Sequence, residues 1–136
     1  MYFLLLLAIV CFLTSARTVI MANTSYATIA AGDNPLYSKF TVKGAMWVNP
    51  NDHDEGTVPI TYNVNSDVSV SKFWSADKGL TLLYDTYSAG FDSFRGTIGA
   101  GRIFIKTGKG ITIKGPISGG PPEGQTIVGS GTWIQG

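Results

Sequence analysis

Residues 57–64 read TVPITYNV, and this stretch decides the fold class because apolar and polar side chains alternate along it. Alternation with a period of two is typical of a β-strand that has one face buried and the other in solvent. No stretch after residue 16 keeps the period of an α-helix for more than about two turns. The positions that we expect to face the core are Val58, Ile60, Tyr62 and Val64.

Segments on both sides of this stretch also carry strand signals. Asp67–Trp74 and Gly79–Thr86 are joined by the turn-type residues Ser75–Lys78, and we expect this pair to form a hairpin. The other expected strands are Leu36–Val48, Ser93–Lys106, Ile111–Lys114 and Gln125–Ile134.

Short strands with turn signals between them predict an all-β antiparallel fold. A parallel sheet is excluded because the chain has no room for crossover helices. Glycines interrupt the strand pattern at Gly96–Gly101 and Gly129–Gly131, and they permit the coiling that barrel closure requires. We therefore predict a single closed antiparallel barrel of about eight strands, with a two-sheet β-sandwich as the alternative.

Two glycine-rich segments are predicted to connect strands. Thr107–Gly110 is a tight turn in which Gly108 and Lys109 suit the central positions of a type II′ loop. Residues Gly115–Gly124 (GPISGGPPEG) carry neither a strand nor a helix signal, so we expect a loop there.

The N-terminus is predicted to be a secretory signal peptide spanning Met1–Ala16. Phe3–Leu13 is an unbroken apolar run, and small residues follow it up to a cut before Arg17. The run is shorter than the roughly 20 apolar residues that a membrane-spanning helix needs. Because Cys11 lies within this segment, the mature chain has no cysteine and no disulfide.

Residues 17–35 are expected to form an N-terminal arm outside the core, and residues 36–136 the barrel domain. The arm lacks both a sustained strand alternation and a helical stripe, and Gly32–Pro35 then breaks the chain. Within the arm, Asn23 begins an Asn-Thr-Ser sequon, which predicts glycosylation if the protein is secreted by a eukaryotic cell.

Charge and composition exclude several classes of function. The formal net charge is +1, and the lysines and arginines are scattered singly along the chain, so we expect no nucleic-acid partner. We also expect no membrane contact once the signal peptide is removed. With one histidine and no cysteine in the mature chain, a structural zinc site cannot form.

Acidic side chains gather in Asn49–Gly56 (NPNDHDEG), where Asp52, Asp54 and Glu55 offer oxygen ligands of the kind that Ca²⁺ prefers. Their spacing does not match the twelve-residue EF-hand loop. A solvated hairpin loop explains the same residues by turn geometry. We therefore predict no bound metal and no cofactor.

Catalysis has only isolated candidates in this sequence. Asp85 and Asp92 lie among aromatic residues, where an apolar pocket can raise the pKa of a carboxyl enough for it to act as a general acid. Asp67 is a third candidate for this role. An acid in such a place is more often an exposed residue at a strand end or turn, and the sequence leaves open whether the protein is an enzyme.

Aromatic residues are numerous, and neighbours on a strand point to opposite faces, so not every ring can lie in one core. Aromatic rings on a rigid β-face suit the C–H face of a sugar or a protein partner. The candidate ligand-binding residues are Trp47, Trp74, Tyr87 and Trp133.

The sequence thus predicts a secreted, non-enzymatic binding module that recognises an extracellular glycan or a partner protein. The alternative is a barrel that encloses a small apolar ligand, either as a carrier or as a cofactor-free isomerase or cyclase. The interior of the barrel distinguishes the two, because the alternative requires a cavity with an inward carboxylate.

Overall fold

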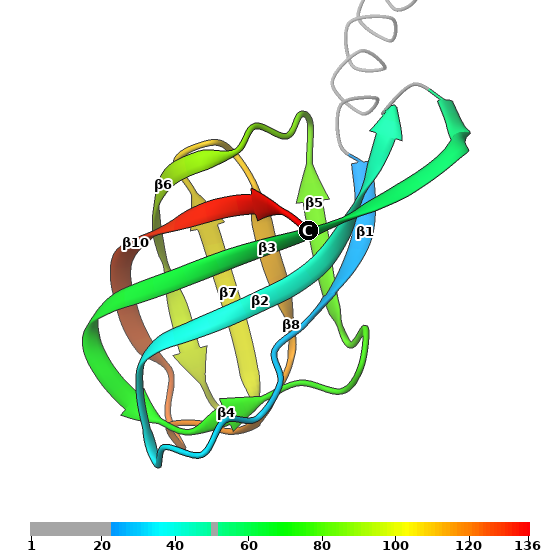
Figure 1. The fold of residues 1–136 in the computed structure, drawn as a ribbon. Coiled ribbons are helices and arrows are strands. Elements are labelled where there is room, and N and C mark those ends of the chain that lie inside the picture. The colour runs from blue at the N-terminus through cyan, green and yellow to red at the C-terminus, as the bar shows by residue number, and fades with distance from the viewer. Residues whose placement is uncertain (1–22, 50–51) are drawn as a thin grey trace, which may run out of the picture.

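The computed structural model describes residues 23–49 and 52–136, so the predicted signal peptide, Met1–Ala16, lies outside the described residues. The described part is all-β (Figure 1), and it contains no helix long and apolar enough to cross a membrane. Its strands are β1 (Asn23–Thr28), β2 (Leu36–Asn49), β3 (Asp52–Ser71), β4 (Phe73–Trp74), β5 (Leu80–Tyr84), β6 (Gly90–Gly99), β7 (Arg102–Thr107), β8 (Thr112–Pro116), β9 (Ser118–Gly119) and β10 (Gln125–Gln135).

Eight of these strands close into one antiparallel barrel in the order β1-β2-β3-β10-β6-β7-β8-β5. The barrel closes between β5 and β1, which pair from Asn23 opposite Tyr84 to Ala27 opposite Leu80. The predicted barrel is therefore confirmed, and the two-sheet sandwich is wrong.

The alternation of the strands builds the core. On β7, Ile103 and Ile105 are buried, while Arg102, Phe104 and Lys106 between and beside them are exposed. The same pattern on the other strands fills the interior with one continuous cluster of apolar side chains. Three of the four core positions predicted in the stretch 57–64 are buried, and the fourth, Val58, is partly buried against the cluster.

Strand coiling depends on glycine at Gly96. A Cβ atom built there would lie 2.0 Å from the carbonyl oxygen of Phe104 on the neighbouring strand. Such close approach of two backbones is a usual reason for glycine within a strand.

The expected N-terminal arm is wrong for the described residues from Asn23 onward. Asn23–Thr28 is β1, which pairs with β5 on one side and β2 on the other, and Ala27 and Ile29 are buried. The segment lacks a strong alternation of its own, because the partner strands rather than its own pattern determine its place in the barrel.

The expected hairpin between Asp67–Trp74 and Gly79–Thr86 is also wrong. Residues up to Ser71 continue β3, and β4 pairs with β9, within the segment that we expected to be a loop. Phe73 is fully buried, and its ring meets the edges of Tyr37 and Phe40 at centroid distances of 5.3 and 5.1 Å. The β4–β9 ribbon therefore crosses one end of the barrel and closes it (Figure 1).

The turn between β7 and β8 differs from the predicted type II′ loop. The positive φ angle, 86°, is at Gly110 rather than Gly108, and the N–H of Gly110 donates to the carbonyl of Thr107. A glycine with positive φ after a turn is the arrangement of a G1 bulge.

At the end opposite the β4–β9 ribbon, β2 and β3 continue beyond the barrel as a projecting hairpin (Figure 1). The pairing of β3 with β10 ends at Ile60 opposite Gln135, whereas β2 and β3 remain paired as far as Asn49 opposite Asp52. This end, where Tyr84 completes β5 and Gly90 begins β6, is called the mouth below.

Candidate functional site

A pocket of about 370 Å³ lies at the mouth and is called the mouth pocket. It contains two of the aromatic residues that the sequence singled out, Trp47 and Tyr87, which come from β2 and from the segment between β5 and β6. Its lining consists of Met46, Trp47, Val58, Tyr84, Thr86, Tyr87 and Gln135.

Trp47 is held in the lining of the mouth pocket by two hydrogen bonds. Its indole Nε1–H donates to the carbonyl of Thr24 on β1 at 3.1 Å, and its backbone N–H donates to the hydroxyl of Tyr84 at 2.6 Å. The indole is only partly buried and packs against the core cluster. The ring is therefore fixed in position while part of it remains accessible.

Tyr87 also lines the mouth pocket, from the segment that joins β5 to β6. Its ring meets Trp133 edge-on, with centroids 6.3 Å apart and planes at 88°. Its hydroxyl oxygen is buried and has no hydrogen-bond partner within the described part of the chain. Burial raises the pKa of this phenol above its ordinary value.

The segment that carries Tyr87 is tied to the neighbouring turn. The Lys109 Nζ atom donates to the carbonyls of Ser88 and Ala89 at 3.0 and 2.9 Å. On the other side, the Asn23 side-chain amide donates to the carbonyl of Asp85 at 3.2 Å. Tyr87 is thus presented by a loop that is anchored on both sides.

Beneath Tyr87, a buried polar network forms the floor of the mouth. The Asp92 carboxylate accepts the Trp133 Nε1–H at 2.9 Å through one oxygen and the Lys109 backbone N–H at 3.0 Å through the other. The Tyr62 hydroxyl donates to the Asp92 carbonyl at 2.6 Å. Burial, and then the negative charge of Asp92, raise the pKa of Tyr62 well above its usual range.

The three candidate catalytic acids stand in different surroundings. Asp85 and Asp67 are exposed, and an Asp67 carboxylate oxygen accepts the backbone N–H of Val128 at 3.3 Å. Asp92 is only 3 % exposed, and both of its carboxylate oxygens already accept hydrogen bonds from the protein. This is the geometry of a carboxylate that holds a fold together rather than one that faces a substrate.

The other two predicted binding aromatics do not line the mouth pocket. Trp133 is fully buried and therefore offers no surface to a ligand, and its ring packs against Tyr87. The prediction that Trp133 contacts a ligand is wrong. Trp74 is exposed on β4, at the closed end of the barrel, where the Lys72 ammonium lies 5.8 Å from its ring centroid.

The calcium candidates lie on the projecting hairpin. Asp52 begins β3, and Asp54 and Glu55 follow it as exposed strand residues. Among the residues that the structure describes, no group of three or more histidine, cysteine, aspartate or glutamate side chains is placed to hold a metal ion.

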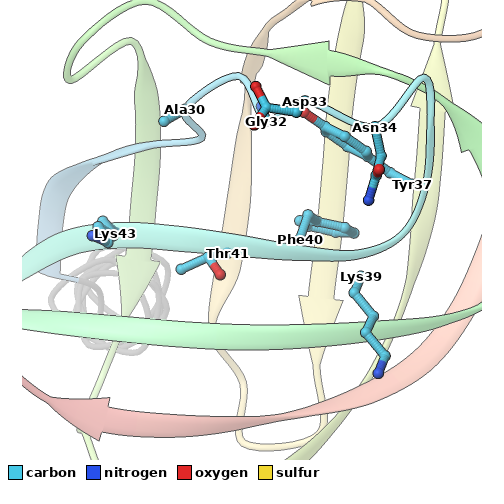
Figure 2. A pocket seen from close by; sticks show the side chains of 9 residues that line it. All are labelled: Ala30, Gly32, Asp33, Asn34, Tyr37, Lys39, Phe40, Thr41 and Lys43. Carbon is cyan, nitrogen blue, oxygen red and sulfur yellow. The ribbon is translucent and has the colours of Figure 1, made fainter.

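A second hollow, the β2 groove, lies near the closed end and has a volume of about 380 Å³ (Figure 2). Its polar lining comes from the β1–β2 connection and the outer face of β2, while Tyr37 and Phe40 are buried beneath. None of the predicted binding aromatics lies in it. The lining residues are Ala30, Gly32, Asp33, Asn34, Tyr37, Lys39, Phe40, Thr41 and Lys43.

The predicted glycosylation site, Asn23, is partly exposed at the start of β1, on the rim of the mouth. Because its amide donates to Asp85, a glycan attached here would project beside the Tyr87 loop.

Most of the mouth pocket could not be predicted from the sequence. Thr86 and Gln135 supply its polar groups, and neither has a motif or spacing that distinguishes it from other surface residues. Both line the pocket because β10 and the segment after β5 reach the mouth from different parts of the chain. The signal that did identify part of the site was the excess of aromatic residues.

The pocket offers a ligand two aromatic side chains together with hydroxyl and amide groups. Searches for similar proteins, made against protein-family models, curated proteins and solved structures, found no match to this chain.

Proposed function

We propose that this protein is a secreted, non-enzymatic binding module whose mouth pocket holds the end of an extracellular glycan. The observation that carries the proposal is the presence of Trp47 and Tyr87 in the lining of one pocket, with a buried Tyr87 hydroxyl that has no partner among the described residues. A buried hydroxyl without a hydrogen bond is unfavourable, so we expect the Tyr87 side chain to turn when a ligand binds and its hydroxyl to pair with a ligand hydroxyl.

The chemistry of the lining supports a sugar as the ligand. A sugar ring has apolar C–H faces and a rim of hydroxyl groups, so it needs aromatic surface together with a few polar groups. The mouth pocket offers both, since Thr86 and Gln135 lie beside the rings. Its volume of about 370 Å³ is at the small end for small-molecule sites, which favours one or two sugar residues.

The alternative of a carrier or cofactor-free isomerase has less support. The described interior is filled by the core cluster, with residues such as Ile60, Leu82 and Ile113 no more than 1 % exposed. The inward carboxylate, Asp92, is engaged by Trp133 and Lys109. A ligand enclosed in the barrel would have to displace this packing.

A glycan array probed with the secreted protein tests the proposal, followed by titration of the retained glycan. Tyr87→Phe removes only the hydroxyl, and we expect it to weaken binding by about tenfold, the equivalent of one buried hydrogen bond. Trp47→Phe is expected to weaken binding further, because it removes part of the stacking surface. Trp74→Phe is the matched control, since Trp74 stands at the closed end of the barrel.

Two results would contradict the proposal. One is the absence of glycan retention by a protein whose circular dichroism shows an intact β-fold. The other is an equal loss of binding in Trp47→Phe and Trp74→Phe. If a protein partner binds the unaltered protein but does not bind Tyr87→Phe, the pocket would instead be assigned to protein recognition.

A further inference from the structure

The fold gathers basic residues that the sequence scatters. On the outer face of β6, β7 and β8, Arg95 lies directly opposite Lys106, and Phe104 lies opposite Lys114. Arg102 stands two residues before Phe104 on the same strand. The surface formed by Arg95, Arg102, Phe104, Lys106 and Lys114 is called the cationic face.

The side chains of the cationic face point away from the core. Phe104 is 45 % exposed, and Arg95, Arg102 and Lys106 are also exposed, whereas Ile103 and Ile105 between them are buried. Strands are spaced about 4.8 Å apart, and residues rise about 3.3 Å along each, so Arg102 and Lys106 lie about 13 Å apart. Four positive charges therefore surround one exposed aromatic ring on a small area.

The three strands of the cationic face carry no outward acidic residue, and Asp67 lies at its edge, where its carboxylate accepts the N–H of Val128, the β10 residue opposite Arg95. The outward positions of β6, β7 and β8 hold no aspartate or glutamate, and Asp92 on β6 faces the core. Within residues 23–49 and 52–136, none of the four cations forms an ion pair. Since the formal net charge of the whole chain is only +1, the cationic face is a local concentration of charge.

The pair Arg95–Lys106 has a cost for the folded protein. Like charges placed directly opposite each other on neighbouring strands are destabilising. A hollow of about 520 Å³ opens at this pair, and its lining includes Ser93 as well as both cations. An anion seated in the hollow would be attracted by both cations and would relieve their repulsion.

We propose that the cationic face binds an acidic polysaccharide, through the sulfate or carboxylate groups of the polymer. The cations are spread over three strands rather than converging on one point, which fits a chain of spaced anions better than a single small anion. Arginine binds such groups through paired hydrogen bonds, and the Phe104 ring offers apolar surface to a sugar face. A nucleic acid is less well matched, because single-stranded binding sites present several stacking aromatics, whereas the cationic face holds Phe104 and the other exposed ring of β6, Phe91, lies four residues before Arg95.

This proposal does not depend on the mouth pocket, but it shares with the proposed function the expectation that the protein is secreted. The experiment measures the affinity of the secreted protein for heparin and for polygalacturonate at about 0.15 M salt, where charges farther apart than about 8 Å are largely screened. Dextran serves as the neutral polymer, and an oligothymidylate and phosphatidylserine vesicles test the other polyanions.

The double variant Arg95→Ser/Lys106→Ser should weaken binding to one of the two acidic polysaccharides by at least about tenfold, since it removes two charge-assisted contacts. Lys39→Ser/Lys43→Ser is the matched control, because it changes the net charge equally but lies on β2, across the barrel from β7. We expect it to change affinity by less than about threefold. Tyr87→Phe should leave this affinity unchanged, so that the two proposals fail or succeed separately.

A second measurement separates binding from damage to the fold. Removing the opposed like charges should leave the urea midpoint of Arg95→Ser/Lys106→Ser equal to or above that of the unaltered protein. The proposal is overturned if neither acidic polysaccharide binds, or if both double variants lose affinity equally. It is also overturned if the oligothymidylate or the vesicles bind more tightly than heparin and polygalacturonate.

Discussion

The indole of Trp133 lies flat against the phenol ring of Tyr62, with ring centroids 4.2 Å apart and planes within 10° of parallel. The two rings come from strands β10 and β3, and both side chains are fully buried. Both side chains also donate a hydrogen bond to Asp92. The Trp133 indole N–H donates to the Asp92 carboxylate, and the Tyr62 hydroxyl donates to the Asp92 backbone carbonyl. The stack therefore joins three strands beneath the mouth pocket.

Asp92→Asn should lower the free energy of unfolding by about 2 kcal/mol, because the new amide group must face one of two N–H donors and leave it unsatisfied. Urea denaturation of the two proteins provides the measurement. Ser93→Ala, an exposed neighbour on the same strand, is the control and should change stability by less than about 0.5 kcal/mol. An unchanged urea midpoint in Asp92→Asn would show that the carboxylate does not support the floor.

Gly96→Ala should be strongly destabilising, by about 3 kcal/mol or more, or prevent folding, because its Cβ would lie 2.0 Å from a backbone oxygen. Gly124→Ala is the matched control, since a Cβ there meets nothing within 4 Å. Thermal unfolding monitored by circular dichroism compares the two. Equal melting temperatures would mean that β6 and β7 can move apart at no cost.

Two tyrosine-to-phenylalanine variants should differ in stability. Tyr87→Phe removes a buried hydroxyl that has no partner among the described residues, so we expect stability to stay constant or rise by up to about 1 kcal/mol. Tyr62→Phe removes a donor to the Asp92 carbonyl and should lower stability by about 1 kcal/mol. Urea denaturation of both variants checks the order. A loss in Tyr87→Phe as large as that in Tyr62→Phe would contradict it.

Alkaline pH should destabilise the protein, because burial raises the pKa of Tyr62, Tyr84 and Tyr87 in the folded state. Above pH 10, the ordinary pKa of a tyrosine, the unfolded chain releases protons that the folded chain retains. Stability is therefore unaffected below that pH and falls above it, by up to about 1.4 kcal/mol per pH unit for each tyrosine. Urea midpoints at pH 9 to 11.5 should show this fall, and Tyr62→Phe should make it shallower. A midpoint independent of pH in this range would refute the linkage.

β1 should be essential for the barrel. Tyr26→Pro removes a backbone donor in a strand that is paired on both sides, and we expect a loss of about 3 kcal/mol or more. Tyr26→Thr keeps the donor and a side chain suited to a strand, so it should be tolerated. Limited proteolysis of both variants provides the readout. Equal resistance in the two variants would restore the view of this segment as an arm outside the core.

The barrel and its antiparallel strands could be predicted from the sequence, because period-two alternation and strand glycines are local signals. TVPITYNV places Tyr62 and Val64 in the core as expected. The errors concern pairing partners. β4 pairs with β9 rather than β5, because the burial of Phe73 under Tyr37 and Phe40 outweighs the turn signal of Ser75–Lys78.

The candidate site was only partly predictable for the same reason. An excess of aromatic residues indicated Trp47 and Tyr87, but alternation alone did not show that Trp133 would be buried. The cationic face was not anticipated, since Arg95 and Lys106 are eleven positions apart and become neighbours only through the β6–β7 register. Single charges in a sequence give no information about which strands will adjoin.

The position of β10 has a consequence for how the protein is made. β10 follows the other nine described strands in the sequence, yet it lies between β3 and β6 and pairs with both along most of its length. During synthesis on the ribosome, β3 and β6 must therefore remain without this shared partner until Gln125–Gln135 has emerged. Unpaired strands are templates for association with other chains. A nascent chain that stalls before Gln125 would expose two such templates. Fast insertion of β10 between β3 and β6 therefore limits the time during which the chain can associate with others.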